Sequence, residues 1–255
     1  MSTIVLNISY YGAPFCGFAR QPEQLTVQGN VESALATIFQ RKIDTVCAGR
    51  TDSGVHAKHQ YVSFEVTDDE AFFYQDKLFK IQNSLESLTH DDIHILSVEI
   101  KFCEFSARFD AKMRKYSYFI ANQKSEALVM RDFSWHIPKP LNIDAMKKSS
   151  AYLIGEHDFK SFCVAASSVD KPTHRNISEI NFVSHQIFGD SILEIQVFGN
   201  AFLHSMVRTL VGTLVKIGLG HREPEWIVDV LNAKDRQAAG ECAPAKALVL
   251  MDVVY

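Results

Sequence analysis

The strongest constraint on the fold is an order of strand and helix patterns that occurs twice along the chain. Residues 3–10 place Ile4, Leu6, Ile8 and Tyr10 on one face, which is the period-two pattern of a half-buried strand. Residues 27–40 carry apolar side chains at helical spacing and follow Thr26, a residue type that caps helices. The rest of this half is expected as strands near 43–48 and 60–66, a helix near 69–84 and a strand near 93–100.

The second half repeats this order of elements without a repeat of sequence. Its expected elements are a strand at 116–122, a helix at 143–153, strands near 177–187 and 191–198, helices at 201–217 and near 224–232, and a last strand at 248–254. Such units form antiparallel sheets with helices on one face. We therefore expect an α+β protein with two βαββαβ (ferredoxin-like) halves, residues 1–104 and residues 105–255.

Composition excludes several classes of protein. Hydrophobic residues make up 47% of the chain and charged residues 22%, which is typical of a globular protein and not of a disordered one. No apolar run is long enough to span a membrane, and the N-terminus lacks the pattern of a signal peptide, so a cytoplasmic location is expected. The five cysteines are scattered and never spaced as C-x-x-C, which favours reduced thiols.

The net charge of −4 does not by itself suggest a nucleic-acid partner. Residues 65–104, however, carry ten acids and three Lys or Arg, so the remainder of the chain sums to +3. A solvated acidic face can coexist with a basic cleft elsewhere. The composition therefore permits RNA binding without predicting it.

The segment most suggestive of chemistry is 48–57, AGRTDSGVHA, in the loop between two expected strands. Its glycines allow a bulky substrate to approach the backbone closely, on either side of Asp52. Arg50 offers a cation that would keep a partly buried aspartate ionised, as suits a nucleophile or charge stabiliser. A hairpin turn with a structural Arg–Asp pair explains the same residues equally well.

The string GRTDSGVHA closely resembles the GRTDAGVHA motif of the TruA family of tRNA pseudouridine synthases, with Ser53 in place of the usual Ala. Three further blocks agree in the right order. The first block, FSARF at 105–109 with RKYSY at 114–118, is similar to the family's F-x-A-R-F and R-x-Y-x-Y. The second, NAFLHSMVRTLVG at 200–212, is similar to its N-x-F-x-x-x-M-V-R-x-x-V-G. The third, the ending 247–255, is similar to its final strand. The resemblance covers nearly the whole chain.

The chain also departs from the family pattern in three places. The usual Y-D-G reads Tyr10-Tyr11-Gly12, and G-W-Q-x-Q reads Gly17-Phe18-Ala19-Arg20-Gln21. The usual N-x-x-L-P stretch is replaced by Asn83-Ser84-Leu85. The first two departures lie outside the catalytic loop, so we expect activity to be retained and the grip on the RNA arm to be what changes.

The resemblance assigns roles to single residues. Asp52 corresponds to the essential catalytic residue, Arg208 to the arginine placed against it, and Tyr116 to the tyrosine that stacks on the target uridine, with Tyr118 as a second, structural tyrosine. Arg50 would contact the RNA backbone or help to flip the base.

Residues beside these tyrosines are open to two interpretations. Tyr116, Tyr118 and Ile120 share one strand face, and the neighbouring cations are Arg108, Lys112, Arg114 and Lys115. This combination suits base stacking and phosphate binding. A core strand with tyrosines at its solvent end explains the same pattern.

The expected helix 201–217 has a buried stripe formed by Leu203, Met206, Val207, Leu210, Leu214 and Ile217. His204 and Arg208, four residues apart, would lie together on its flank. There Arg208 can reach a carboxylate, whereas His204 would only cover the helix.

No cofactor is expected. His56 and His59 lack the third ligand that a metal site needs, and no dinucleotide-binding or P-loop motif occurs. The resemblance implies a cofactor-independent isomerase, of the pseudouridine synthase-type fold, that acts at positions 38, 39 and 40 of the tRNA anticodon stem-loop as a homodimer. Alternatives are a synthase of this fold acting on other RNA uridines, an RNA-binding protein without chemistry, and a metal-dependent hydrolase.

Overall fold

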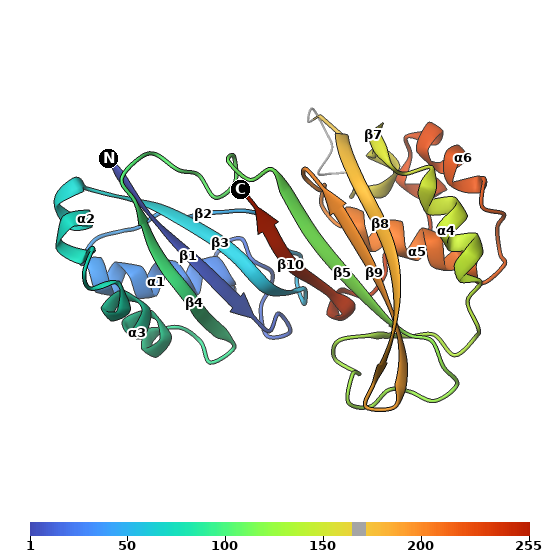
Figure 1. The fold of residues 1–255 in the computed structure, drawn as a ribbon, viewed down its shortest axis with the longest axis horizontal. Helices are drawn as coiled ribbons and strands as arrows, with labels where there is room; N and C mark the ends of the chain where they lie inside the picture. Colours follow the sequence, from blue (N-terminus) through green and yellow to red (C-terminus); the bar gives the residue numbers. More distant parts are fainter. Residues whose placement is uncertain (165–171) are drawn as a thin grey trace. The chain divides into compact units, whose positions relative to one another are not determined.

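The structure is a computed structural model that describes residues 1–164 and 172–255. The chain divides into two compact units, one comprising Met1–Lys112 with Leu250–Tyr255 and the other Met113–Val249 (Figure 1). Each unit is a mainly antiparallel sheet with helices packed against it, which confirms the α+β class. The first unit extends past residue 104, the boundary expected from the sequence, and it takes in most of the last strand.

The first unit contains a sheet with the strand order β4-β1-β3-β10, and a short strand, β2, also pairs with β3. Helices α1 and α3 contact each other, and α3 contacts β4. In the antiparallel register Ile4 lies opposite Phe64 on one side and Ile100 on the other. The elements are β1 (Ser2–Tyr10), α1 (Val27–Phe39), β2 (Val46–Cys47), β3 (His56–Val66), α2 (Asp68–Tyr74), α3 (Leu78–Leu88), β4 (Ile93–Lys101) and β10 (Leu248–Val254).

The second unit has the strand order β5-β9-β8-β7, with β6 parallel to β5. Helix α5 packs on α4 and contacts β5. Tyr118 lies opposite Ile195 in this sheet, and both are fully buried. The elements are β5 (Met113–Ala121), β6 (Trp135–His136), α4 (Ile143–Ala151), β7 (Gly155–Asp158), η1 (Lys160–Phe162), β8 (His174–Ile187), β9 (Asp190–Gly199), α5 (Met206–Gly218), α6 (Trp226–Ala233), η3 (Arg236–Ala238) and η4 (Ala245–Ala247).

Two expected elements of the first unit differ from the structure. The single helix near 69–84 is wrong: α2 ends at Tyr74, and the Lys77 amide donates to the Tyr74 carbonyl at 2.8 Å in a turn before α3. Lys77 has a φ of −132°, which is outside the helical range. The expected strand 43–48 is reduced to Val46–Cys47. The helical spacing of apolar residues continues through the turn between α2 and α3, so the sequence pattern does not show that the helix ends there.

The helix expected at 201–217 begins only at Met206. The backbone of Asn200 is bound elsewhere, because its amide donates to the Asn176 carbonyl at 3.0 Å and its carbonyl accepts from Arg114 Nη1 at 2.6 Å. Ser205 has a φ of 58°, a left-handed conformation that separates this segment from the helix. Hydrogen bonds to the sheet therefore replace the first expected helical turn. In the part of the chain that is described, no helix is long and apolar enough to cross a membrane.

Candidate active site

The loop that carries Asp52 is closed at its base by one buried side chain. The Ala48 amide continues the sheet by donating to the Tyr61 carbonyl at 2.9 Å. Gln60, which is fully buried, donates from Nε2 to the Gly49 carbonyl at 2.5 Å and accepts from the Gly49 amide at 3.4 Å. A buried amide that satisfies both backbone groups of one residue holds that residue in place. The loop therefore leaves the sheet from a fixed point.

The backbone on either side of Asp52 is braced by neighbouring segments. The hydroxyls of Thr51 and Tyr10 lie 2.8 Å apart, and the Thr51 carbonyl accepts from the Phe18 amide at 3.1 Å. The Asp52 carbonyl accepts from the Val55 amide at 3.2 Å, which forms a tight turn. Asp52 itself is half-buried. The carboxylate is thus presented on a rigid support, as catalytic groups require.

Ser53, which replaces the alanine of the family motif, has a structural function. Its hydroxyl donates to the Phe15 carbonyl at 3.2 Å, a bond that alanine could not make. Gly17 approaches from the same side, and a Cβ placed on it would lie 3.1 Å from the Thr51 carbonyl oxygen and 3.2 Å from the Ser53 amide. Its φ of +92° also requires glycine. The departure at Ser53 therefore adds a tether to the loop.

The other departures near the loop also have packing partners. Tyr11 stacks on His56, with ring centroids 4.9 Å apart and planes 27° apart. His56 is buried, and its Nδ1 accepts from the Gly12 amide at 2.9 Å, which places the ring proton on Nε2. Phe18 is buried in the core. His56 is thus a support for the loop that no sequence pattern indicated, although it lies within the motif.

Arg50 and Arg108 are exposed cations near the base of the loop. Burial raises the pKa of the Cys47 thiol to about 11, and the positive charges of these two arginines oppose that rise. Both guanidinium groups therefore lie close to Cys47, at the end of β2. Two of the predicted substrate-binding residues, Arg50 and Arg108, thus belong to the first unit.

Tyr116 and Tyr118 lie on β5 in the second unit. Tyr116 is 6% exposed and packs edge to face against Phe202, with ring centroids 5.2 Å apart. Tyr118 is fully buried, and its hydroxyl donates to the Pro244 carbonyl at 2.9 Å. Burial raises the pKa of Tyr118, and the nearby charge of Arg208 lowers it. These contacts support a structural function for Tyr118 and place Arg208 near it.

The two cations that precede Tyr116 lie on opposite faces of β5, since side chains alternate along a strand. Arg114 is buried, and it donates to the Asn200 carbonyl at 2.6 Å. Lys115 places its Nζ 5.3 Å from the centre of the Phe198 ring on the neighbouring strand. Arg114 and Lys115 are adjacent in sequence but do not form one basic patch.

Arg208 is held by the segment that follows α6. Its Nε donates to the Ala243 carbonyl at 2.7 Å, and the Ala243 amide donates to the Arg208 carbonyl at 3.2 Å. His204 is exposed and lies before the first residue of α5, so the prediction that it shares a helical flank with Arg208 is wrong. Asp52 belongs to the first unit and Arg208 to the second, and their pairing stays a prediction.

Comparison with known proteins now defines the family. A family model described as tRNA pseudouridine synthase matches residues 150–255. The chain is 39% identical over 255 residues to tRNA pseudouridine synthase A of Francisella tularensis, covering 100% of this chain and 95% of the relative. The protein of that name from Brevibacillus brevis is 39% identical over 249 residues, or 97% of each chain. The chain belongs to the tRNA pseudouridine synthase A family.

A solved structure, an unknown protein from Galdieria sulphuraria, aligns over 86% of this chain and 95% of its own chain. Its TM-score of 0.21 and 14% identity are too low to support an argument. The assignment to the tRNA pseudouridine synthase A family therefore depends on the full-length relatives, whose similarity includes both the Asp52 loop and the Arg208 helix.

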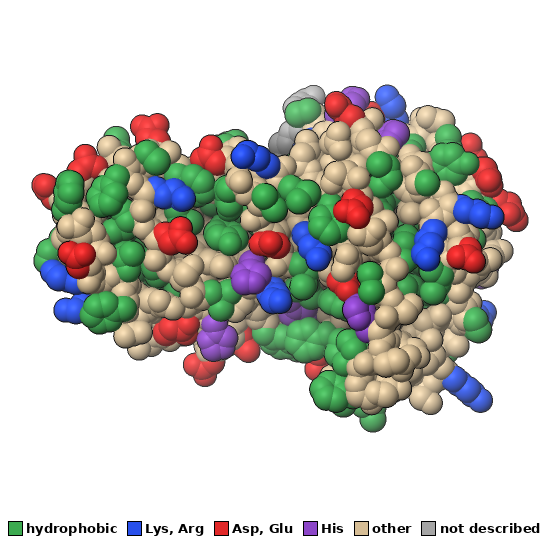
Figure 2. Space-filling model, viewed as in Figure 1, with side chains coloured by type: hydrophobic (Ala, Val, Ile, Leu, Met, Phe, Trp, Pro, Cys, Tyr) green, Lys and Arg blue, Asp and Glu red, His purple; other side chains and the backbone are tan. Residues whose placement is uncertain are grey.

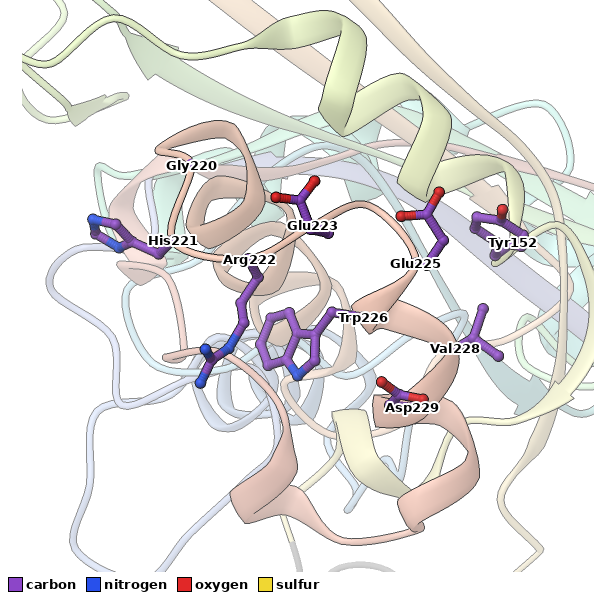
Figure 3. A pocket seen from close by; sticks show the side chains of 9 residues that line it. All are labelled: Tyr152, Gly220, His221, Arg222, Glu223, Glu225, Trp226, Val228 and Asp229. Atoms are coloured by element: carbon purple, nitrogen blue, oxygen red, sulfur yellow. The ribbon is translucent and has the colours of Figure 1, made fainter.

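Two hollows among the described residues of the second unit are lined by residues other than the predicted site residues. One, of about 640 Å³, is lined by residues of α6 and the turn before it, with Arg222 beside the Trp226 ring (Figure 3). Another, of about 590 Å³, lies between α4 and β8. Among residues 1–164 and 172–255, no group of three or more His, Cys, Asp or Glu is arranged to hold a metal ion.

Proposed function

We propose that this enzyme converts uridine to pseudouridine at positions 38, 39 and 40 of the tRNA anticodon stem-loop, with Asp52 as its catalytic residue. The observation that carries the proposal is the half-buried Asp52 at a backbone turn, with its neighbour Thr51 bonded to Phe18 and Tyr10 and its neighbour Ser53 bonded to Phe15. The reaction breaks the bond between uracil N1 and ribose C1′ and joins C5 to C1′. A proton then moves from C5 to N1, so atoms and charge balance without a second reactant.

Asp52 acts on a nucleotide that has left the RNA stack. Extruding the base costs a few kcal/mol, which aromatic stacking and phosphate contacts offset. The carboxylate then either attacks C1′ and forms a covalent intermediate or removes a ribose proton to give a glycal. Arg208 would keep Asp52 ionised and oriented, because a nearby cation favours the charged form of a carboxyl group.

The remaining predicted residues would bind the RNA. Arg50 and Arg108, both exposed near the loop, suit contacts with phosphate. Arg114 would support RNA binding indirectly, by holding the Asn200 segment, and Lys115 would contact the RNA from the other face of β5. Tyr116 would stack on the base, and this requires the ring to become accessible, since Phe202 now packs against it.

These cations would act locally and not through a general positive field. The chain has a net charge of −4, and Figure 2 shows acidic and basic side chains interspersed on the face it presents. Specific phosphate contacts can bind RNA in such a background because they neutralise charges at short range. We also propose, from the family resemblance, that the enzyme works as a homodimer.

Pseudouridine mapping in tRNA from cells that lack the gene tests the proposal. We expect pseudouridine to disappear at positions 38, 39 and 40 and to return with the wild-type gene or with Asp76→Asn, an exposed control far from the motif. The Asp52→Asn gene should not restore it. Loss at other uridines would favour a synthase of the same fold with another target, and unchanged tRNA would overturn the proposal.

A further inference from the structure

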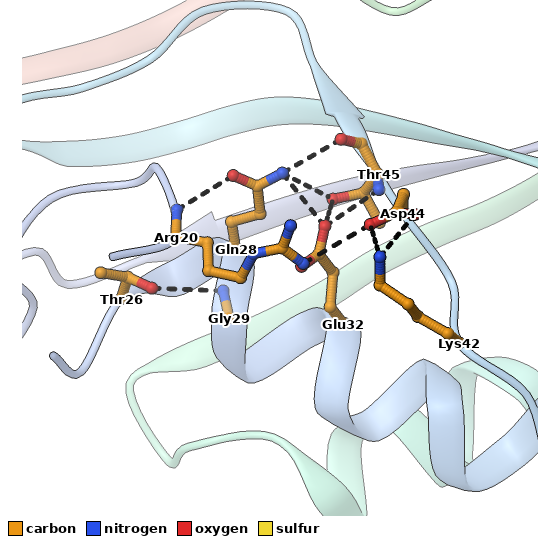
Figure 4. Close-up of polar contacts among 8 residues, drawn as sticks. All are labelled: Arg20, Thr26, Gln28, Gly29, Glu32, Lys42, Asp44 and Thr45. Carbon is orange, nitrogen blue, oxygen red and sulfur yellow. Dashed lines mark hydrogen bonds and ion pairs between the residues drawn. The ribbon is translucent and has the colours of Figure 1, made fainter. Parts of the chain in front are cut away.

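Glu32 on α1 is a buried carboxylate with four hydrogen-bond donors around it. Its side chain is 7% exposed. Oε1 accepts from the Thr45 amide at 3.0 Å, the Thr45 hydroxyl at 2.9 Å and Gln28 Nε2 at 3.1 Å, and Oε2 accepts from Arg20 Nη1 at 2.6 Å (Figure 4). A buried carboxylate is tolerated only where its oxygens are satisfied in this way.

This cluster joins three segments that are separate in the sequence. Gln28 and Glu32 belong to α1, Thr45 directly precedes β2, and Arg20 follows the Gly17–Phe18 segment. Gln28 reinforces the connection, since its Nε2 also donates to the Thr45 carbonyl at 3.0 Å and its Oε1 accepts from the Arg20 amide at 3.0 Å (Figure 4). Movement of any one segment would break bonds to the other two.

Both segments held by Glu32 reach the loop that carries Asp52, one along the chain and the other through a hydrogen bond. From Thr45 the chain runs through β2 to Gly49, where the loop begins. From Arg20 it runs back to Phe18, whose amide donates to the Thr51 carbonyl at 3.1 Å, and to Gly17, which lies against the same loop. The loop is thus supported at its base through Thr45 and along its side through Arg20.

We propose that Glu32 is a positioning residue for the reaction, acting on Asp52 through Thr45 and Arg20. This inference rests on the catalytic function proposed for Asp52. Replacing the carboxylate by an amide in Glu32→Gln removes the charge and places an N–H group among donors. The loop would then lose its fixed position, although no residue that contacts RNA is changed.

Glu70→Gln is a matched control in the same unit. The Glu70 carboxylate also accepts from a backbone amide, that of Thr67 at 2.8 Å, and from an arginine, Arg41, at 2.9 and 3.0 Å. It caps α2, and these hydrogen bonds join Glu70 to Thr67 and Arg41, neither of which belongs to the Asp52 loop. A general loss of stability should affect both variants, whereas a positioning effect should appear only in Glu32→Gln.

We expect kcat of Glu32→Gln to fall by about tenfold to a hundredfold, the range that a small misplacement of a catalytic group produces. KM and tRNA affinity should stay within about threefold, because the binding groups are untouched. Amide hydrogen exchange at Phe18 and Val55 should become faster in Glu32→Gln and stay unchanged in Glu70→Gln, since these amides report the loop directly.

Arg20→Ala provides a second variant, since the Arg20 side chain is 52% exposed and its removal should not prevent folding. Its kcat should fall in the same direction, and adding it to Glu32→Gln should lower kcat no further, as for residues acting through one network. Arg20→Lys, which keeps a charge and a donor, should recover part of the loss.

The inference would be overturned if folded Glu32→Gln kept the wild-type kcat and the wild-type amide protection. If Glu32→Gln does not fold, an unchanged kcat in Arg20→Ala would overturn it. An inactive wild-type enzyme would refute the proposed function instead. In that case hydrogen exchange still decides whether Glu32 holds the loop.

Discussion

Gly212 lies on α5 where the helix meets the segment that holds Arg208. A Cβ added at this position would lie 1.9 Å from the Glu241 carbonyl oxygen and 2.9 Å from its carbon. That oxygen would have to move by about 1 Å or more to reach an ordinary contact distance. Because these are backbone atoms, Gly212→Ala must displace the chain that leads to Ala243.

The expected cost of Gly212→Ala follows from three effects. Overpacking against a fixed neighbour costs about 1–3 kcal/mol. Displacing residues 240–243 also weakens two hydrogen bonds, from the Gly240 amide to Thr213 Oγ1 at 2.9 Å and from the Ala243 amide to the Arg208 carbonyl at 3.2 Å. These contribute about 1 kcal/mol each. The higher helix propensity of alanine stabilises the variant by about 1 kcal/mol, so the net destabilisation should be about 2–4 kcal/mol.

Urea unfolding followed by tryptophan fluorescence measures this cost, because both tryptophans, Trp135 and Trp226, lie in the second unit. Gly218→Ala is the matched control on the same helix. Its Cβ would lie 2.6 Å from the sulfur of Met146, a flexible side chain that can move aside, so the cost should stay below about 1 kcal/mol. Equal free energies of unfolding for the two variants would refute the reasoning.

Four further outcomes are expected. Asp52→Asn should abolish tritium release from 5-labelled uridine in tRNA while filter binding stays within a few-fold, and substantial turnover would remove Asp52 from its assigned function. Tyr116→Leu should weaken tRNA binding by about 1–3 kcal/mol because it removes the stacking ring. Tyr116→Phe keeps the ring and should bind well, but we expect it to stall before the proton leaves C5, because the Tyr116 hydroxyl is our candidate for the base that accepts this proton. Mass spectrometry of digested tRNA would show the stalled species, and a normal yield at a normal rate would leave Tyr116 with stacking alone. Affinity for tRNA should fall about a hundredfold between about 50 and 200 mM salt if about four phosphates are contacted, and a flat response would refute that. Cys47 should resist alkylation near pH 8, because its thiol is buried and its pKa is raised to about 11, whereas the exposed Cys103 and Cys242 should react. Rapid labelling of Cys47 would contradict its burial.

Elements with a strong local pattern could be located from the sequence. The alternation in 3–10 and the helical spacing after Thr26 match β1 and α1 to within about one residue, because such periodicity records which face is buried. The proximity of Arg50 and Asp52 also follows from the sequence, since both lie in one short loop. Local order and residue adjacency are properties of the chain itself.

Other features depended on bonds between distant segments. The start of α5 at Met206 reflects the hydrogen bonds of Asn200 to Asn176 and Arg114, which no helical pattern reveals. The break before Lys77 is likewise hidden by continuous apolar spacing. Propensity is a weak preference that long-range hydrogen bonds can override.

The supports of the active-site loop were also decided by tertiary structure. Glu32 lies between Arg20 and Thr45, residues that are far from it in the chain and that carry no catalytic motif. Tyr11, a departure from the family pattern, stacks on His56, a contact that the sequence does not reveal. The motifs in the sequence predict which residues perform the chemistry. The tertiary structure decided which residues hold them, because burial and hydrogen bonding join positions that sequence spacing leaves unrelated.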